Sequence, residues 1–257
     1  MRKIYKSQIF RNLSVIAIFL IIWTIISYTN WAQNGTSNRM WFSNINEVAL
    51  AFKDILFNKM VNVYSSFILI LKSTFIVIIL GVFFGILIGF FDNVYKSLKW
   101  SIDFWRSIPP IIVIGIFINL DTSMDEIYWR TWLVVFGTLP IMIMQIADAI
   151  NNSSKKRMLI FQSLNTSVSF KIKNVIIYEI LPSLFSTTRT IISLAIVIII
   201  VTEMLFSPLS GIGKHVQEYQ SASEIQYVYA YAIIVGIIGL LLNETLRYFE
   251  NKIISWE

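Results

Sequence analysis

The sequence predicts an all-α membrane protein whose chain crosses the bilayer six times. Three observations support this class: the composition, six long apolar stretches, and an uneven distribution of basic residues among the connecting segments. Hydrophobic residues make up 56% and charged residues 14% of the 257 positions, whereas soluble domains contain about 45–50% apolar and about 25% charged residues. This excess of apolar residues indicates that lipid is the solvent for much of the chain. Cysteine is absent, which excludes a disulfide framework and cysteine-based metal or redox sites.

Six apolar stretches, alone or with their flanks, are long enough for the roughly 20 residues that a membrane helix needs. We expect spans near Leu13–Tyr28, Ser66–Phe91, Ile102–Asn119, Trp132–Ile150, Thr187–Phe206 and Tyr227–Tyr248. A seventh segment, Val48–Tyr64, mixes apolar residues with Lys53, Asp54 and Lys59. That pattern favours an amphipathic helix at the membrane surface over a further span.

Basic residues predict the orientation, because Lys and Arg concentrate in cytoplasmic loops. With a cytoplasmic N-terminus, the inside segments hold Arg2, Lys3, Lys6, Arg11, Lys96, Lys99, Lys155, Lys156, Arg157, Lys171, Lys173, Arg247 and Lys252. The outside segments hold only Arg39, Lys53, Lys59, Arg130 and Lys214. We therefore expect a multi-pass protein of the bacterial plasma membrane with both termini in the cytoplasm. The net charge of +6 then reflects topology, and nucleic acid is not needed as a partner.

The spans contain three features of interest for packing or transport. Gly81, Gly85 and Gly89 are four residues apart, so they share one helix face and predict a close contact with another helix. Arg106 precedes Pro109 and Pro110, which predict a kink because each proline lacks an N–H and clashes with the carbonyl four residues earlier. This segment either packs against the bundle or lines a transport pathway. Glu203 and Met204 end the fifth apolar stretch, where Glu203 is either a carboxylate at the membrane interface without a further role or a residue of the pathway.

The longest basic and polar insertion lies between the fourth and fifth spans. Lys155, Lys156 and Arg157 open it, a short apolar run follows at 158–161, and Asn165-Thr166-Ser167 provides capping side chains for a helix near Phe170. An insertion of this kind either lies on anionic lipid or offers a docking helix to a cytoplasmic partner.

The order of these segments resembles the membrane permeases of ABC importers for nitrate, sulfonate, taurine and related compounds. The resemblance covers about Ser66 to Trp256 and rests on five pieces in the same order. They are LGVFFGILIGF at 80–90, RSIPPI at 106–111, LNTSVSFKIKNVIIYEILPSLFSTTR at 164–189, TEM at 202–204 and GIG at 211–213. The chain departs from the family pattern at Leu159-Ile160-Phe161, where Glu-Ala-Ala is usual, and at Asn165, where glycine is usual.

The resemblance implies a type I ABC importer permease fold, with a single permease domain over 1–257, its core at 66–250 and a cytoplasmic coupling loop at 151–187. It implies a homodimer, cytoplasmic ATPase subunits that bind ATP and Mg, and an extracytoplasmic binding protein that delivers a small anion. It also implies a helix that docks on the ATPase, formed by Met158, Leu159, Ile160, Phe161, Gln162, Ser163, Leu164, Asn165, Thr166, Ser167 and Phe170. Arg106, Pro109, Pro110, Glu203 and Met204 are the pathway or gating candidates. A thiamine-precursor-like solute remains open as the substrate.

Two other functions compete with this interpretation. A secondary transporter without an ATPase needs buried carboxylates or histidines for ion coupling, and the predicted spans contain few such residues. A membrane enzyme needs clustered acid, base and nucleophile side chains, which a single histidine and scattered carboxylates do not supply. The resemblance implies that the chain hydrolyses nothing itself and binds no cofactor, and it has no G-x-x-x-x-G-K-[ST] loop for a nucleotide. We also expect no metal site, because three or four ligands cannot be assembled around the single histidine, His215.

Overall fold

The computed structural model describes residue 18 and residues 21–27, 43–120, 126–152, 177–206 and 210–254, and all regular structure in these ranges is helical. The chain divides into two compact units. The smaller unit comprises Met1–Met60 and His215–Ile234, and the larger comprises Val61–Lys214 and Val235–Glu257. The prediction of one permease domain over the whole chain stays a prediction.

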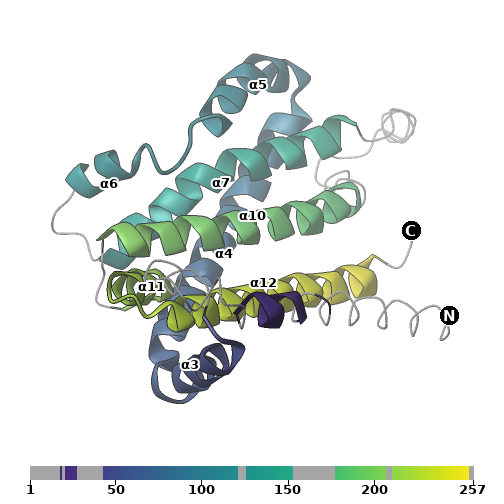
Figure 1. Ribbon diagram of the computed structural model, residues 1–257. Coiled ribbons are helices and arrows are strands. Elements are labelled where there is room, and N and C mark those ends of the chain that lie inside the picture. Colours follow the sequence, from purple (N-terminus) through teal and green to yellow (C-terminus); the bar gives the residue numbers. More distant parts are fainter. Residues whose placement is uncertain are drawn as a thin grey trace, which may run out of the picture. The chain divides into compact units, whose positions relative to one another are not determined.

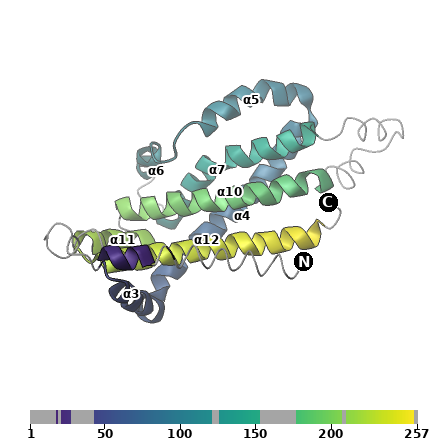
Figure 2. The same cartoon turned by 45° about the vertical axis from the view of Figure 1, so that its right-hand side comes forward.

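The larger unit is built on three long helices: α4 (Met60–Phe90), α7 (Glu126–Asn151) and α10 (Ile177–Phe206). In both ribbon views α7 and α10 lie side by side, and α5 (Asp92–Arg106) lies along α7 (Figures 1 and 2). In the most apolar 18-residue stretch of α7, 67% of the residues are buried, whereas the corresponding shares are 33% for α4 and 39% for α10. Helix α7 is therefore the central helix of this unit.

Small residues bring α4 close to α7. A Cβ atom added to Gly85 would lie 2.7 Å from the Cβ of Ile146, and one added to Gly89 would lie 2.9 Å from the Cα of Ala147. A Cβ on Gly81 would overlap the side chain of Met142. The predicted glycine face is confirmed as a helix-packing seam, and α7 is its partner.

Four helices are long and apolar enough to cross a membrane among the described residues: Met60–Phe90, Trp129–Asn151, Ile177–Phe206 and Ile225–Ile253, the last being α12. They correspond to the second, fourth, fifth and sixth predicted spans. Half of the first predicted span, Leu13–Tyr28, lies outside the described residues, and the other half, residues 18 and 21–27, is helical. By length and composition, the described helices are therefore suitable for four of the six expected spans.

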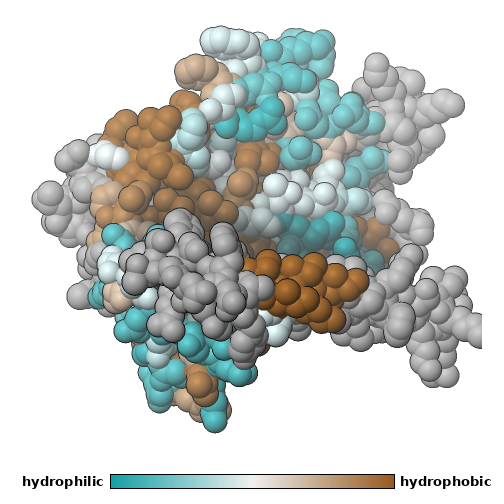
Figure 3. All heavy atoms as spheres, in the orientation of Figure 1, coloured by the Kyte–Doolittle hydropathy of each residue, from teal (hydrophilic) through white to brown (hydrophobic). Residues whose placement is uncertain are grey.

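The third predicted span, Ile102–Asn119, is not one kinked helix, and the prediction of a continuous span was wrong. Helix α5 ends at Arg106, and α6 (Ile114–Leu120) begins only after a run of turns. In these turns the N–H groups of Ile112 and Val113 donate to the carbonyls of Pro109 and Pro110. Two consecutive prolines remove two helical donors and disfavour the α conformation before them, so the helix stops where a kink was expected. Figure 3 shows hydrophilic side chains over α5 and hydrophobic ones over α6.

The fifth span begins earlier than predicted, at Ile177 rather than Thr187. Residues 177–187 of the predicted coupling loop form the first turns of α10. A helix of 30 residues is about 45 Å long, whereas the hydrocarbon core is about 30 Å thick. The apolar stretch in the sequence marks only the part of the helix that suits a lipid environment. It does not indicate the helical turns that precede this part, residues 177–186.

The smaller unit contains α3 (Ile45–Asn58), which Asn44 caps by accepting a hydrogen bond from the N–H of Asn46. Val48, Ala51 and Ile55 are buried on one face of α3. Its 14 residues make a helix of about 21 Å, too short to cross a bilayer. The prediction of an amphipathic, non-spanning helix in this region is confirmed, although the helix ends before Tyr64 and α4 begins at Met60.

Candidate functional site

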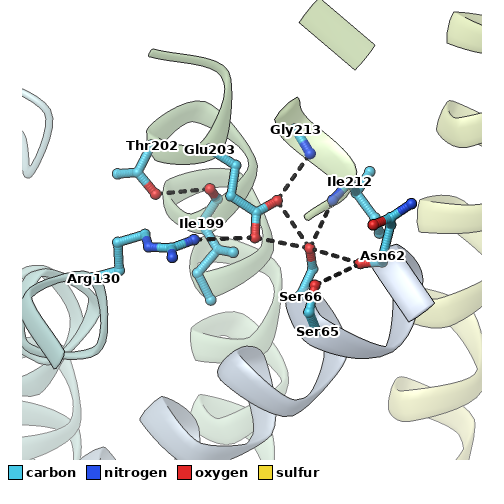
Figure 4. A network of polar contacts seen from close by, with 9 residues as sticks. All are labelled: Asn62, Ser65, Ser66, Arg130, Ile199, Thr202, Glu203, Ile212 and Gly213. Atoms are coloured by element: carbon cyan, nitrogen blue, oxygen red, sulfur yellow. Dashed lines mark hydrogen bonds and ion pairs between the residues drawn. The ribbon is translucent and has the colours of Figure 1, made fainter. Parts of the chain in front are cut away.

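The carboxylate of Glu203 is the centre of a buried network of polar contacts in the larger unit (Figure 4). Glu203 lies near the end of α10, and its side chain is 1% exposed. The hydroxyl of Ser66, on α4, lies 2.8 and 2.9 Å from the two carboxylate oxygens and donates its one proton to this carboxylate. The N–H of Gly213 donates to Oε2 at 2.9 Å. Glu203 is therefore a buried acceptor that ties α4 and α10 together.

The chain segment after α10 folds back onto this carboxylate because two of its residues have no side chain. The N–H of Ile212, the first residue of α11 (Ile212–Ser221), donates to the Ser66 hydroxyl at 2.9 Å. Gly211 has a φ of +148°, and a Cβ there would lie 2.5 Å from the Glu203 carboxyl carbon. A Cβ on Gly213 would overlap the carbonyl of Ile200. The TEM and GIG segments quoted from the sequence thus meet at one site.

Arg130 of α7 supplies the positive charge of the network. Its Nη1 lies 3.6 Å from Oε1 of Glu203, and its side chain is only 6% exposed. An unpaired carboxylate in a protein interior is costly, so this cation offsets part of the penalty for burying Glu203. The sequence placed Arg130 in an outside segment and Ser66 at the start of a span, and it did not indicate that either belongs to a site. Ser66 and Glu203 are 137 residues apart, and no sequence spacing indicates their contact.

A cavity of about 260 Å³ lies beside the network, entirely within the larger unit. Its lining residues come from α4, α7, α10 and the segment before α11: Tyr64, Ser65, Ile68, Leu69, Lys72, Arg130, Glu203 and Ser210. Glu203 is thus the pathway candidate that borders this partly open pocket. Met204 is half-buried next to it.

The other pathway candidates lie elsewhere in the larger unit. Arg106 is exposed and forms an ion pair of 3.0 Å with Asp103, one turn earlier on α5. Pro110 packs against Gly137 of α7 so closely that a Cβ on this glycine would overlap the proline ring. Pro109 is exposed. The structure therefore gives Pro110 a packing contact and does not bring these three residues to the Glu203 cavity.

Polar contacts at the other ends of the helices join further pairs of elements. The hydroxyl of Tyr95 on α5 donates to Asp148 of α7 at 2.5 Å, and this bond to a carboxylate raises the pKa of Tyr95. Arg189 of α10 forms an ion pair with Glu250 of α12. An open polar groove of about 670 Å³ runs beside this pair, bordered by Ser193, Asn243 and other residues of both helices.

The smaller unit has its own charged cluster. Lys59 donates to Asp54 at 2.6 Å and to the hydroxyl of Tyr219 at 2.6 Å, and its ammonium lies 4.4 Å from the ring centre of Tyr227. The rings of Tyr219 and Tyr227 stack with centroids 4.2 Å apart. The hydrogen bond from Lys59, followed by that from Asn58, lowers the pKa of Asp54 from 3.8 to about 2. Burial alone would lower the pKa of Lys59, but its bonds to Asp54 and Tyr219 raise it overall.

The predicted ATPase-docking residues lie outside the described part of the structure. This applies to the whole set: Met158, Leu159, Ile160, Phe161, Gln162, Ser163, Leu164, Asn165, Thr166, Ser167 and Phe170.

Residues 78–255 match the family model of the binding-protein-dependent transport system inner membrane component. The chain belongs to this family. The matched range contains Arg130, Glu203 and Gly213 of the buried network, whereas Ser66 precedes it. This is a family of transport proteins and not of enzymes, and its members lie in the inner membrane, which agrees with the four apolar helices.

Individual relatives support the family. The chain is 36% identical over 75 residues to an ABC transporter permease protein of Methanocaldococcus jannaschii, covering 29% of this chain and 28% of that protein. It is 24% identical over 156 residues to a protein of Bacillus subtilis named as the aliphatic sulfonates transport permease SsuC, covering 61% and 55%. The chain thus spans between about a quarter and about half of the length of these relatives.

The fold is similar to a solved structure of the inward-facing MetNI methionine ABC transporter. The TM-score is 0.60 at 15% identity, covering 76% of this chain and 94% of that one. These matches confirm the resemblance to ABC importer permeases, and they confirm the predicted all-α permease fold.

Proposed function

We propose that this chain is the transmembrane permease subunit of an ATP-binding cassette importer and forms the path by which a small organic anion enters the cell. The observation that carries the proposal is the family match over residues 78–255, which covers three of the four apolar helices in full and part of α4. An aliphatic sulfonate is the favoured solute, because a relative that shares 156 aligned residues is named for sulfonates.

The proposed partners follow from the family. They are cytoplasmic ATPase subunits that bind ATP and Mg, a second copy of this chain, and an extracytoplasmic binding protein. Such a system works only when ligands shift the permease between inward- and outward-facing states. Closure of the ATPases would push on a docking helix near Met158–Phe170 and so drive this shift. In this scheme the chain itself carries no ATP site and hydrolyses nothing.

The function is tested by reconstitution. The permease is purified together with the ATPase and binding protein encoded beside it, inserted into liposomes, and supplied with labelled ethanesulfonate. We expect uptake that needs ATP and the binding protein and that ionophores leave unchanged. Uptake without ATP that stops when ion gradients are dissipated would overturn the proposal in favour of secondary transport. ATP-driven uptake of a thiamine precursor, with no uptake of sulfonate, would retain the permease role and change only the solute.

The docking role is tested by placing a charge on the proposed apolar surface. Phe161→Asp and Leu164→Asp should abolish co-purification of the ATPase while the permease still inserts in the membrane, because a buried unpaired carboxylate costs several kcal/mol. Ala222→Asp is the matched control, since Ala222 is exposed in a turn. Normal assembly of both docking variants would show that the ATPase binds elsewhere.

A further inference from the structure

We infer that one charged side of α5 lines a water-filled crevice that reaches from the cytoplasm deep into the membrane. This side is formed by Lys96, Lys99, Asp103 and Arg106, which we call the charged stripe of α5. The inference rests on the proposed function, because the crevice would form the cytoplasmic part of the transport path. Of these four residues, only Arg106 was a pathway candidate from the sequence.

The charged stripe follows from the periodicity of the helix. Its residues are spaced three, four and three apart, so they lie along one side of α5. The neighbouring side packs on α7, where Ile102 belongs to the same buried cluster as Leu139. The side chains of Lys96, Arg106 and Asp103 are 68%, 45% and 38% exposed. The stripe therefore lies beside the contact with α7 and is open along its length.

Contacts between α5 and α7 show how far the stripe extends along the bundle. At the start of α5, the hydroxyl of Tyr95 donates to Asp148 of α7. Near the end of α5, the ring centres of Trp105 and Phe136 lie 5.5 Å apart. From Asp148 to Phe136 the axis of α7 advances by about 18 Å. Helix α5 thus runs antiparallel to α7, alongside it in both ribbon views (Figures 1 and 2).

The level of Asp148 marks one edge of the apolar layer of the bundle. The apolar part of α10, Thr187–Phe206, is about 30 Å long as a helix, which is the thickness of the hydrocarbon core. At its far end the ring centres of Phe206 and Trp129 of α7 lie 5.5 Å apart. From Trp129 to Asp148 the axis of α7 covers about 29 Å. The last turn of α5 therefore lies about 18 Å inside a layer of about 30 Å.

The deep end of the charged stripe is unsuited to lipid. Lys96 and Lys99 lie near the edge of the layer, and their long side chains can reach the head groups. Asp103 cannot reach them, because its side chain is short and it lies about two turns deeper than Lys96. Its ion pair with Arg106 at 3.0 Å would still lose hydration in lipid. Charged residues at this depth almost always face the bundle interior or a water-filled cavity, and the exposed side chain of Asp103 favours the cavity.

The other sides of α5 have a different character. Trp100 and Phe104 are 76% and 62% exposed, and their rings stack with centres 6.0 Å apart. Such an apolar surface suits lipid. Ser101 is exposed on the side of α5 away from Asp103, since two residues advance about 200° around a helix. Asp103 and Ser101 thus lie at nearly the same depth on opposite sides, and only the side of Asp103 should contact water.

Single cysteines can test the crevice, because the chain has no native cysteine. Full-length Asp103→Cys and Ser101→Cys chains in inside-out vesicles are treated with 2-sulfonatoethyl methanethiosulfonate. This reagent is membrane-impermeant and carries an ethanesulfonate group, like the proposed solute. We expect Asp103→Cys to react at least about tenfold faster than Ser101→Cys, because only the thiolate reacts and apolar surroundings suppress its formation. Lys99→Cys, about one turn nearer the cytoplasm, should react at least as fast as Asp103→Cys.

The labelling outcomes separate the crevice from the proposed function. Equal rates at Asp103→Cys and Ser101→Cys, or no reaction at Asp103→Cys, overturn the crevice even where ATP-driven uptake is observed. Reaction of Asp103→Cys in intact cells but not in inside-out vesicles overturns it as well. The expected pattern supports the crevice even where reconstituted uptake fails, since labelling requires no transport. If Asp103→Cys lowers the thermal unfolding midpoint, Arg106→Cys, the deepest position of the stripe, replaces it in the same comparison.

Discussion

At the scale of single residues, Ser66 shows how one hydroxyl can serve two partners. It donates to Glu203 and accepts from the N–H of Ile212, so it connects α4, α10 and α11. Ser66→Ala leaves a buried carboxylate with one donor fewer and an N–H without its acceptor. We expect a loss of about 1–3 kcal/mol in the free energy of unfolding, measured by denaturant titration in detergent.

The neighbouring Ser65 is the matched control for this prediction. It is half-buried, and its hydroxyl donates only to the carbonyl of Asn62 within its own helix at 2.9 Å. Ser65→Ala should therefore change the free energy of unfolding by less than about 0.5 kcal/mol. Equal losses in the two variants would mean that the bond between Ser66 and Glu203 contributes nothing specific.

At the scale of elements, the contact between α4 and α7 depends on the absence of side chains at Gly81, Gly85 and Gly89. Gly85→Ala places a methyl group against Ile146 and the backbone of α7, and we expect it to destabilise the chain by about 1–3 kcal/mol. Gly236→Ala on α12 is the control, because nothing lies within 4 Å of its added Cβ. Alanine there should be neutral or stabilising by up to about 1 kcal/mol, as in other helices. A loss of stability in Gly236→Ala but not in Gly85→Ala would contradict the dependence of the contact between α4 and α7 on these glycines.

The hydrogen bonds to Asp54 lower its pKa, so the stability of the smaller unit should fall as the pH is lowered. The folded pKa of about 2 lies below the usual 3.8, so the stabilisation is complete above about pH 4 and is lost as the pH falls toward 2. We expect the wild type to unfold at a higher temperature than Asp54→Asn at pH 5, and the difference to disappear near pH 2. Lys59→Met removes the main cause of the lowered pKa and should abolish this dependence too. A difference that stays constant from pH 5 to pH 2 would contradict the assignment.

At the scale of the whole molecule, the topology predicted from basic residues can be measured directly, because the chain has no native cysteine. Single cysteines are introduced at Ser154, in the basic insertion, and at Ala222, in the turn after α11. A membrane-impermeant maleimide should label Ala222→Cys in intact cells and Ser154→Cys only after permeabilisation. The reverse pattern would place the proposed docking segment outside the cell and remove the basis for ATPase binding.

The sequence predicted the long spans well because length and apolar composition are local properties. It predicted the glycine seam because residues four apart on a helix share a face, whatever the partner helix is. It failed at Ile102–Asn119, where the break at Pro109 and Pro110 is complete, and at the start of α10, where helical turns continue beyond the apolar stretch. The residues of the buried network were recovered only in part: Glu203 was noted as a candidate, and Ser66 and Arg130 were not.

The sequence by itself determined the class of protein, the family and the order of the helices, because composition, periodicity and motif order are written along the chain. Only the tertiary structure decided that Glu203 is buried, that Ser66, Arg130 and Gly213 are its partners, and that a partly open pocket lies beside it. The physical reason is distance along the chain: these contacts join residues from four helices, and no local pattern encodes which faces meet.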